Sequence, residues 1–292
     1  MDTVVRDCKI NNAVAIPRQV KRSSRSSFYV LSLLLVVGIC QTVRAQPGVR
    51  TRLGTAGEWK DTIALATMDD RLYTIERNGA LYVTDLTSGK WIQIGKAQFG
   101  STQFMFADAG SLYTIEADGG LYRLNPADGS WRAVGDAGAW KGTIAGATLN
   151  GRIYTVEGNG ALYETNPANG RWRQLGKPEF SRTRHIFAAE GSLYTIEDGG
   201  LYRVSPTDGS WALVGKAEDW SGTRAVAVLA GRLFSANRNG ALYRSLLSTG
   251  GWIAVGKPVF GDTAYLFESG RRLYSIDLDG SLYAIDTPRL SN

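Results

Sequence analysis

The residues that could carry out chemistry include acids that return at a nearly constant interval. Five carboxylates and one amide occupy corresponding positions in successive segments: Glu76, Glu116, Glu157, Glu197, Asn237 and Asp277. Two carboxylates that flank a glycosidic bond can hydrolyse it. An acid that recurs in nearly every segment, beside an Asn-Gly or Asp-Gly pair, is more simply explained as a hydrogen-bond acceptor that stabilises a turn. We therefore expect these acids to be structural.

Other catalytic groups are scarce. A serine–histidine–acid triad would have to use His185, the one histidine in the sequence. No Gly-x-Ser-x-Gly motif presents a nucleophile, and His185 stands where related segments carry Phe or Tyr, which favours a structural or rim position. Metal sites usually combine several His, Cys or carboxylate ligands at suitable spacing, and nucleotide-binding glycine loops open a helix. Since the sequence shows neither pattern, we expect no enzymatic activity, no metal and no cofactor.

Aromatic residues offer clearer binding chemistry. Six of them stand in the segments that connect one repeat to the next, alternating between two types: Trp59, Phe99, Trp140, Phe180, Trp220 and Phe260. An aromatic ring suits the C–H face of a sugar, and polar neighbours can bond its hydroxyls. The alternative is that these aromatic rings fill seams between repeats, and both interpretations stay open.

The elements that would position these residues follow a repeat of about 40 residues. Its marker is an aromatic residue in a β-rich run, at Tyr73, Tyr113, Tyr154, Tyr194, Phe234 and Tyr274. Each run is followed by a hairpin signal, Asn-Gly or Asp-Gly, whose two residues are expected to adopt positive φ. The asparagines of this signal are Asn78, Asn159 and Asn239. A further run opens with Trp at Trp91, Trp131, Trp172, Trp211 and Trp252, which we expect to be buried in the core.

Four short antiparallel strands in each of six repeats predict an all-β fold, a six-bladed β-propeller of four-stranded antiparallel blades. The last repeat lacks its Trp strand, whereas residues 50–54 resemble residues 211–215. We therefore expect the N-terminal strand to complete the last blade and remove the exposed edges. The connecting segment should share a face with the hairpin turns, which would bring Trp59, Trp140 and Trp220 close to an Asn-Gly or Asp-Gly turn of their own or an adjacent blade. Because the connecting aromatics alternate between Trp and Phe, the sequence also indicates three doublets, each made of two repeats.

The first 45 residues predict a signal peptide. Lys21, Arg22 and Arg25 precede an apolar run over 28–40, and Val43 and Ala45 stand at positions −3 and −1 of a cleavage site near Ala45. The apolar run is shorter than the roughly 20 residues of a membrane span, and an uncleaved signal anchor is the alternative. The predicted mature domain, residues 46–292, is therefore expected to be secreted or periplasmic, without membrane attachment after signal removal.

The charge balance of the mature domain argues against nucleic acid as a partner. Residues 46–292 hold 26 Lys and Arg against 25 Asp and Glu, whereas nucleic-acid binding requires a basic face. Both cysteines, Cys8 and Cys40, belong to the leader, so the domain has no disulfide or thiolate chemistry.

The stretch 94–106, IGKAQFGSTQFMF, followed by GSLY at 110–113, resembles the repeats of tachylectin-type β-propeller lectins. The resemblance covers residues 50–285 and implies shallow sites between blades that bind N-acetylated sugars without catalysis. The matching residues are the connecting aromatics together with Phe104, Phe106, Phe187 and Phe267. This chain departs from the family in its shorter repeat, its number of blades and the Phe that half of its connecting segments carry.

These observations predict a secreted, multivalent carbohydrate-binding protein of the lectin type that binds a glycan surface. Its candidate ligand-binding residues are Trp59, Trp140, Trp220, Phe99, Phe180, Phe260, Asn78, Asn159 and Asn239. An extracellular propeller scaffold that binds another protein is the alternative. A propeller enzyme such as a lactonase is disfavoured by the lack of a metal-ligand set.

Overall fold

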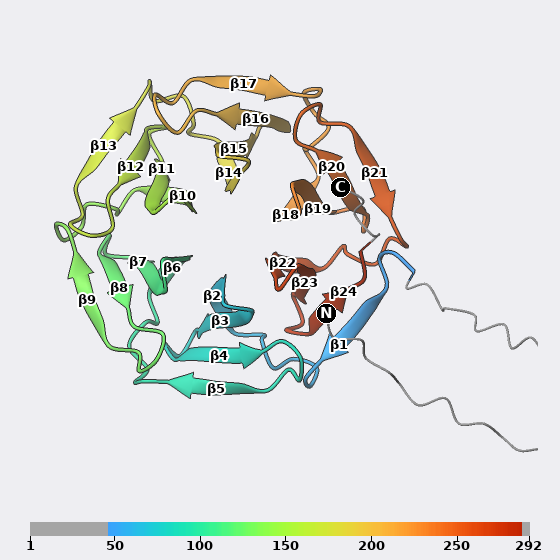
Figure 1. The fold of residues 1–292 in the computed structure, drawn as a ribbon, viewed down its shortest axis with the longest axis horizontal. Coiled ribbons are helices and arrows are strands. Elements are labelled where there is room, and N and C mark those ends of the chain that lie inside the picture. Colours follow the sequence, from blue (N-terminus) through green and yellow to red (C-terminus); the bar gives the residue numbers. More distant parts are fainter. Residues whose placement is uncertain (1–45, 288–292) are drawn as a thin grey trace, which may run out of the picture. The chain divides into compact units, whose positions relative to one another are not determined.

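The computed structural model describes residues 46–287, which fold into a ring of six four-stranded sheets (Figure 1). These residues form strands and turns but no helix. The fold is a six-bladed β-propeller, as the repeat count predicts. The predicted signal peptide lies outside the described residues.

The blades are numbered along the chain, and within each blade the strands follow one another from the axis to the rim. Blades 1 to 3 contain β2 (Thr62–Met68), β3 (Arg71–Glu76), β4 (Leu81–Asp85) and β5 (Trp91–Ile94); β6 (Thr102–Asp108), β7 (Ser111–Glu116), β8 (Leu121–Leu124) and β9 (Trp131–Val134); and β10 (Thr143–Leu149), β11 (Arg152–Glu157), β12 (Leu162–Thr165) and β13 (Trp172–Leu175). Blades 4 to 6 contain β14 (Thr183–Ala189), β15 (Ser192–Glu197), β16 (Gly200–Val204) and β17 (Trp211–Val214); β18 (Thr223–Leu229), β19 (Arg232–Asn237), β20 (Leu242–Leu246) and β21 (Trp252–Val255); and β22 (Thr263–Ser269), β23 (Arg272–Asp277), β24 (Leu282–Ile285) and β1 (Arg50–Leu53).

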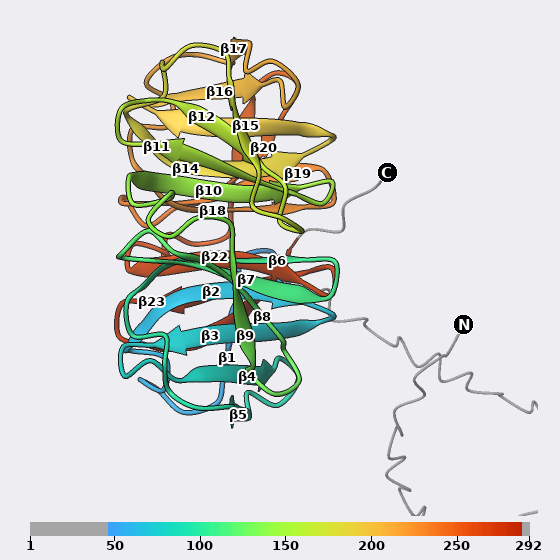
Figure 2. The same ribbon diagram turned by 90° about the vertical axis from the view of Figure 1, so that its left-hand side faces the viewer.

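Each blade twists strongly from the axis to the rim. Figure 1 shows the innermost strands nearly end-on and the outer strands lying along the ring, and the edge view in Figure 2 shows β9 crossing steeply over β7 and β8. This twist follows from the preferred right-handed twist of each strand. The innermost strands, which line the axis, have seven residues, and the outermost strands, which form the rim, have four.

The hairpin turns between the second and third strands differ from the prediction in one detail. In blade 2 only Gly119 has positive φ, at 85°, and Asp118 does not. The Gly119 amide donates to the Glu116 carbonyl at 2.8 Å, so the loop is a type I turn followed by a left-handed glycine. In blade 4 the predicted two-residue form is present, because Asp198 and Gly199 have φ of 46° and 79°.

The N-terminal strand closes the ring as predicted. β1 pairs antiparallel with β24, with Arg50 opposite Ile285. Arg50 occupies the position that the other blades give to Trp, and its Nη1 donates to Asp277 Oδ2 at 2.7 Å. Its guanidinium also lies 4.3 Å from the ring centre of Tyr283. Ionic and cation–π contacts thus replace the aromatic pair of the other blades.

The strand tryptophans correct a prediction. They are not buried, since Trp131, Trp172, Trp211 and Trp252 are each about half exposed, at 47–51%. The outermost strand of a blade has solvent on its far side, so a side chain there is covered only by its own blade. Each indole packs against the tyrosine of the neighbouring strand, as in the edge-on Tyr163–Trp172 pair with ring centres 4.9 Å apart. These residues form an aromatic rim and not the core.

Candidate functional site

Blade 3 carries a pocket of about 380 Å³ beside the segment that connects it to blade 2. We name it the blade 3 pocket. It is lined by Ala139, Trp140, Gly142, Thr155, Glu157, Gly158, Asn159, Tyr163 and Trp172. The structure therefore brings together two of the predicted ligand-binding residues, Trp140 and Asn159, with the aromatic pair of Tyr163 and Trp172. An aromatic wall facing polar groups suits a polar ligand that has one apolar face.

Blade 5 repeats this arrangement in a pocket of about 260 Å³, the blade 5 pocket. It is lined by Asp219, Trp220, Ser221, Gly222, Ser235, Asn237, Asn239, Tyr243, Ser245 and Trp252. Trp220, Asn239, Tyr243 and Trp252 stand at the positions of Trp140, Asn159, Tyr163 and Trp172. Two blades of the same kind thus present the same aromatic and amide groups, as the alternation in the sequence predicts.

The chain positions the connecting tryptophans through the preceding hairpin turn. The Trp140 amide donates to the Gly119 carbonyl at 3.0 Å, and the Trp220 amide donates to the Gly199 carbonyl at 2.9 Å. This places each connecting aromatic beside an Asn-Gly or Asp-Gly turn, as predicted. The rings themselves are buried, with exposed fractions of 2% for Trp140 and 4% for Trp220. They therefore contribute the floor of the pocket and not a free stacking face.

The other predicted aromatics are buried too. Trp59, Phe99, Phe180 and Phe260 are exposed by 4% or less, and each belongs to a hydrophobic cluster that includes strands of neighbouring blades. This burial supports the alternative that the connecting aromatics fill the seams. The ligand-binding role of these aromatics stays a prediction.

The turn asparagines have a common local role. The side-chain oxygens of Asn78, Asn159 and Asn239 accept hydrogen bonds from the amides of Ala80, Ala161 and Ala241 at 2.9 to 3.0 Å. Such side-chain bonds stabilise a turn. The exposed Asn239 also donates from its amide nitrogen to the Tyr243 hydroxyl at 3.1 Å, which fixes that tyrosine at the pocket wall.

Four of the five recurring acids accept hydrogen bonds from threonines that open the innermost strands. Thr143 Oγ1 donates to Glu157 Oε1 at 2.8 Å in the blade 3 pocket, and Thr62 does the same to Glu76. Burial raises the pKa of the Glu157 carboxyl above its ordinary value, and the bond from Thr143 opposes that shift. In the blade 5 pocket the uncharged Asn237 stands in this place. Each pocket therefore has one acid in its lining, but at different places: Glu157 in the blade 3 pocket and Asp219 in the blade 5 pocket.

In blades 2 and 4 the rim tryptophan is hydrogen-bonded to the connecting segment. The Trp131 indole nitrogen donates to Gln98 at 3.2 Å, and that of Trp211 donates to Glu179 at 3.0 Å. Both acceptors belong to the connecting segment, just before its Phe. These tryptophans instead line shallow pockets with an arginine that is bonded to a serine, such as Arg123 to Ser111 at 2.9 Å. Pockets of two kinds thus alternate from blade 2 to blade 5.

In blade 1 the rim tryptophan leans inward. Trp91 lies with its ring centre 6.0 Å from that of Trp59 and 4.1 Å from that of Tyr82, and it is only partly exposed. The described aromatic pairs include no equivalent contact between Trp140 and Trp172. Blade 1 therefore holds the same residues as blades 3 and 5 in a more closed arrangement.

The residues that make these pockets accessible are not among those predicted from the sequence: Tyr163, Trp172, Tyr243 and Trp252. Their signal is a cross-strand Tyr–Trp pair repeated in every complete blade. From sequence alone, a Trp that opens a strand indicates a core position, because Trp is usually well buried. Within residues 46–287 no cluster of three or more His, Cys, Asp or Glu side chains could hold a metal ion. The same residues include no helix of the length and hydrophobicity that a membrane span requires.

No family model and no curated protein matches the sequence significantly. Solved structures do match, with low identity. Virginiamycin B lyase from Staphylococcus aureus has a TM-score of 0.56 at 11% identity, with 83% of this chain and 89% of that chain covered. YCF48 bound to a D1 peptide has a TM-score of 0.57 at 17% identity, with 79% of each chain covered. A protein of unknown function from Bacteroides thetaiotaomicron has a TM-score of 0.61 at 13% identity, with 82% and 73% covered. These likenesses show the propeller fold.

Proposed function

We propose that the protein is a non-catalytic carbohydrate-binding protein that acts outside the cytoplasm and binds glycans through the blade 3 and blade 5 pockets. The observation that carries this proposal is the repeated combination of an exposed rim Trp, a Tyr and a turn Asn around each pocket. A sugar ring would stack on the exposed indole and direct its hydroxyls toward the pocket amides. The resemblance to tachylectin-type lectins suggests an N-acetylated sugar.

Both pockets also offer hydrogen-bonding groups at their floor. In the blade 5 pocket the Trp220 indole nitrogen and the Ser245 hydroxyl are buried and have no hydrogen-bond partner among the described residues. In the blade 3 pocket the Thr155 hydroxyl is buried as well and lies beside the Glu157 carboxyl. Buried polar groups without partners are costly, so a hydroxylated ligand would gain free energy by bonding them.

Repetition of the site matters for affinity. A shallow pocket that stacks one sugar ring desolvates few atoms and should bind weakly. Two or more such pockets on one rigid ring can engage a dense glycan surface together, and linked sites can raise apparent affinity by about 10²–10⁴. We therefore expect weak binding of free sugar and strong retention on a sugar-coated resin.

The test compares rim tryptophans of the two kinds of blade. The double variant Trp172→Ala/Trp252→Ala removes the exposed wall of both pockets, and Trp131→Ala/Trp211→Ala removes equally exposed tryptophans of blades 2 and 4. Retention on an N-acetylglucosamine resin should be lost in the first variant and kept in the second, with unchanged melting temperatures. Equal retention of both variants would assign the sugar site elsewhere.

A protein partner is the second candidate. A structural neighbour of similar fold, YCF48, is described with a bound D1 peptide, and exposed Trp residues are common at protein interfaces. A glycan array distinguishes the two candidates. Absence of any retained glycan, together with peptide binding that depends on Trp172 and Trp252, would favour the scaffold.

A further inference from the structure

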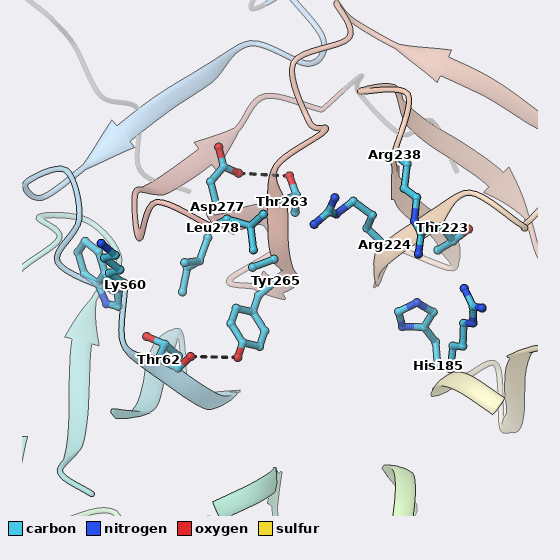
Figure 3. Close-up of a pocket in the computed structure, with 14 residues that line it drawn as sticks. Lys60, Thr62, His185, Thr223, Arg224, Arg238, Thr263, Tyr265, Asp277 and Leu278 are labelled. Carbon is cyan, nitrogen blue, oxygen red and sulfur yellow. Dashed lines mark hydrogen bonds between the residues drawn. The ribbon is translucent and has the colours of Figure 1, made fainter. Parts of the chain in front are cut away.

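A further pocket lies at one end of the propeller axis and is not part of the rim sites. It has a volume of about 700 Å³ and is lined by the first residues of innermost strands β2, β14, β18 and β22, together with residues that follow β19 and β23. We name it the axial pocket. Figure 3 shows its side chains, with Arg224 extending from β18 toward Thr263 of β22 and Arg238 descending beside Thr223 toward His185.

The backbone places particular residues at this mouth. Every innermost strand has an irregularity in its pairing after the first residue, so that the second residue has no partner in the neighbouring strand. Such bulges redirect a side chain, often beside a binding site. The bulged residues are Ile63, Gln103, Ile144, Arg184, Arg224 and Ala264. Only blades 4 and 5 carry arginine there, which breaks the symmetry of the ring on one side of the mouth.

Positive charge gathers in the axial pocket without a matching acid. Arg184, Arg224, Arg238 and Lys60 line it, and none of them forms an ion pair with a described carboxylate. Its one acid, Asp277, is already paired with Arg50 at 2.7 Å. Arg224 is partly buried and the other three are exposed, and an anion in the pocket would be attracted to their positive charges.

Blade 5 strengthens this imbalance by losing an acid. The carboxylate that ends the second strand in the other five blades is Asn237 in blade 5, the blade that supplies Arg224 and Arg238. Thr223 lacks a carboxylate like the Glu157 that Thr143 bonds, and its hydroxyl is buried without a hydrogen-bond partner among the described residues. The hydroxyl of Thr183 in blade 4 is likewise without a partner, although blade 4 keeps Glu197. Thr223 lines the axial pocket. The pocket thus combines unpaired cations with a buried hydroxyl that is able to donate.

The histidine adds a neutral polar group to the same wall. Burial lowers the pKa of His185 to about 4, with the positive charge of Arg184 acting in the same direction, and a hydrogen bond to the Thr223 backbone opposes the shift. His185 is therefore uncharged at neutral pH. The charge of the axial pocket comes from arginine and lysine alone.

We propose that the axial pocket binds a tetrahedral oxyanion, the phosphate or sulfate group of a polar ligand. Guanidinium groups present paired N–H donors that match such anions. The candidate anion ligands are the guanidinium groups of Arg184, Arg224 and Arg238, whereas Lys60 lies on the opposite side of the pocket (Figure 3). This inference is independent of the sugar site, because the rim tryptophans Trp172 and Trp252 do not line the axial pocket.

The experiment measures anion binding by isothermal titration calorimetry at constant ionic strength in chloride. The probes are inorganic phosphate, inorganic sulfate, glucose 6-phosphate and N-acetylglucosamine 6-sulfate. The test variant is Arg184→Gln/Arg224→Gln. The matched control is Arg132→Gln/Arg171→Gln, which changes two exposed arginines at the rim. Melting temperatures are compared to establish that both variants fold.

We expect saturable binding of at least one probe by the parent and the control, weakened about tenfold or more in the test variant. Tighter binding of the sugar phosphate or of the sugar sulfate identifies which ester the pocket prefers. Retention on the sugar resin should stay unchanged in the test variant. A failure of the anion-site proposal can therefore be distinguished from a failure of the sugar-site proposal. Failure of all four probes to bind, or equal binding by the test variant and the parent, would overturn the proposal.

Discussion

Blade 3 takes its four strands from one continuous stretch, whereas blade 6 takes its outermost strand from the opposite end of the domain. In blade 3 the outer strand opens with Trp172, which packs on Tyr163 and leaves a pocket beside Trp140. In blade 6 the same place belongs to Arg50, which packs on Tyr283 and bonds Asp277. The comparison shows that the first residue of the outermost strand can differ in chemistry from blade to blade. This is possible because the buried side chains between neighbouring blades provide the packing.

The largest effect should come from removing the strand that distinguishes blade 6. Deletion of residues 46–53 exposes the edge of β24, and an unpaired strand edge invites association with other chains. We expect a lower melting temperature and aggregation, measured by circular dichroism and light scattering. Substituting serine for the exposed Thr51 and Arg52 keeps the strand and serves as the control. A truncated protein that is monomeric and melts like the parent would show that closure by β1 contributes nothing.

The next effect separates the floor of blade 3 from its rim. Trp140→Ala removes a side chain that is 2% exposed and should lower the free energy of unfolding by about 3–5 kcal/mol, because it opens a cavity. Trp172→Ala removes one that is 51% exposed and should cost less than about 1 kcal/mol. Urea denaturation measures both values. Similar costs for the two variants would contradict the division into floor and rim.

A smaller effect is expected at the ion pair of blade 6. Arg50→Ala leaves the largely buried Asp277 without its cation and should cost about 2–3 kcal/mol. The double variant Arg50→Ala/Asp277→Asn removes the unpaired charge as well and should recover part of that loss. A double-mutant cycle measures the coupling. If the double variant is no more stable than Arg50→Ala, the charge of Asp277 is not the source of the cost.

The smallest effect concerns the pH dependence of blade 3. Burial holds the pKa of Glu157 above its ordinary value, so the folded state binds this proton more tightly than the unfolded state does. The resulting stabilisation is fully present below the unfolded pKa and is lost as the pH rises through the folded pKa. Glu157→Gln should therefore gain stability relative to the parent between acidic and neutral pH, as measured by urea denaturation at each pH. A difference that does not change with pH would contradict the shift.

The sequence predicts the fold well because its repeat is strong. The Tyr markers, the Asn-Gly and Asp-Gly turns and the match of residues 50–54 to residues 211–215 together predict six blades and their closure, and the structure contains both. These features are local or periodic. Turn chemistry and strand alternation act over a few residues, so they can be read without knowledge of the packing.

The exposure of the aromatics could not be read in this way. Trp140 and Trp172 have the same residue type, and only the position of their segments in the blade decides which is buried. A connecting segment runs into the seam between two sheets, whereas an outermost strand has a sheet on one side and solvent on the other. The charge imbalance of the axial pocket is equally hidden, because Arg184, Arg224 and Lys60 are far apart in the sequence.

The pairing of β1 with β24 also sets an order of events during synthesis. Arg50 and Asp277 are separated by 227 positions in the chain, and a ribosome adding about 5–20 residues per second needs on the order of tens of seconds to cover that distance. Throughout that time the first strand made has no partner, while blades 1 to 5 can form behind it. The short β1 carries two arginines, Arg50 and Arg52, and charged residues on a short strand discourage premature pairing. Only a chain translated beyond Leu282 can engage β1, so ring closure acts as a check that translation of the domain is complete.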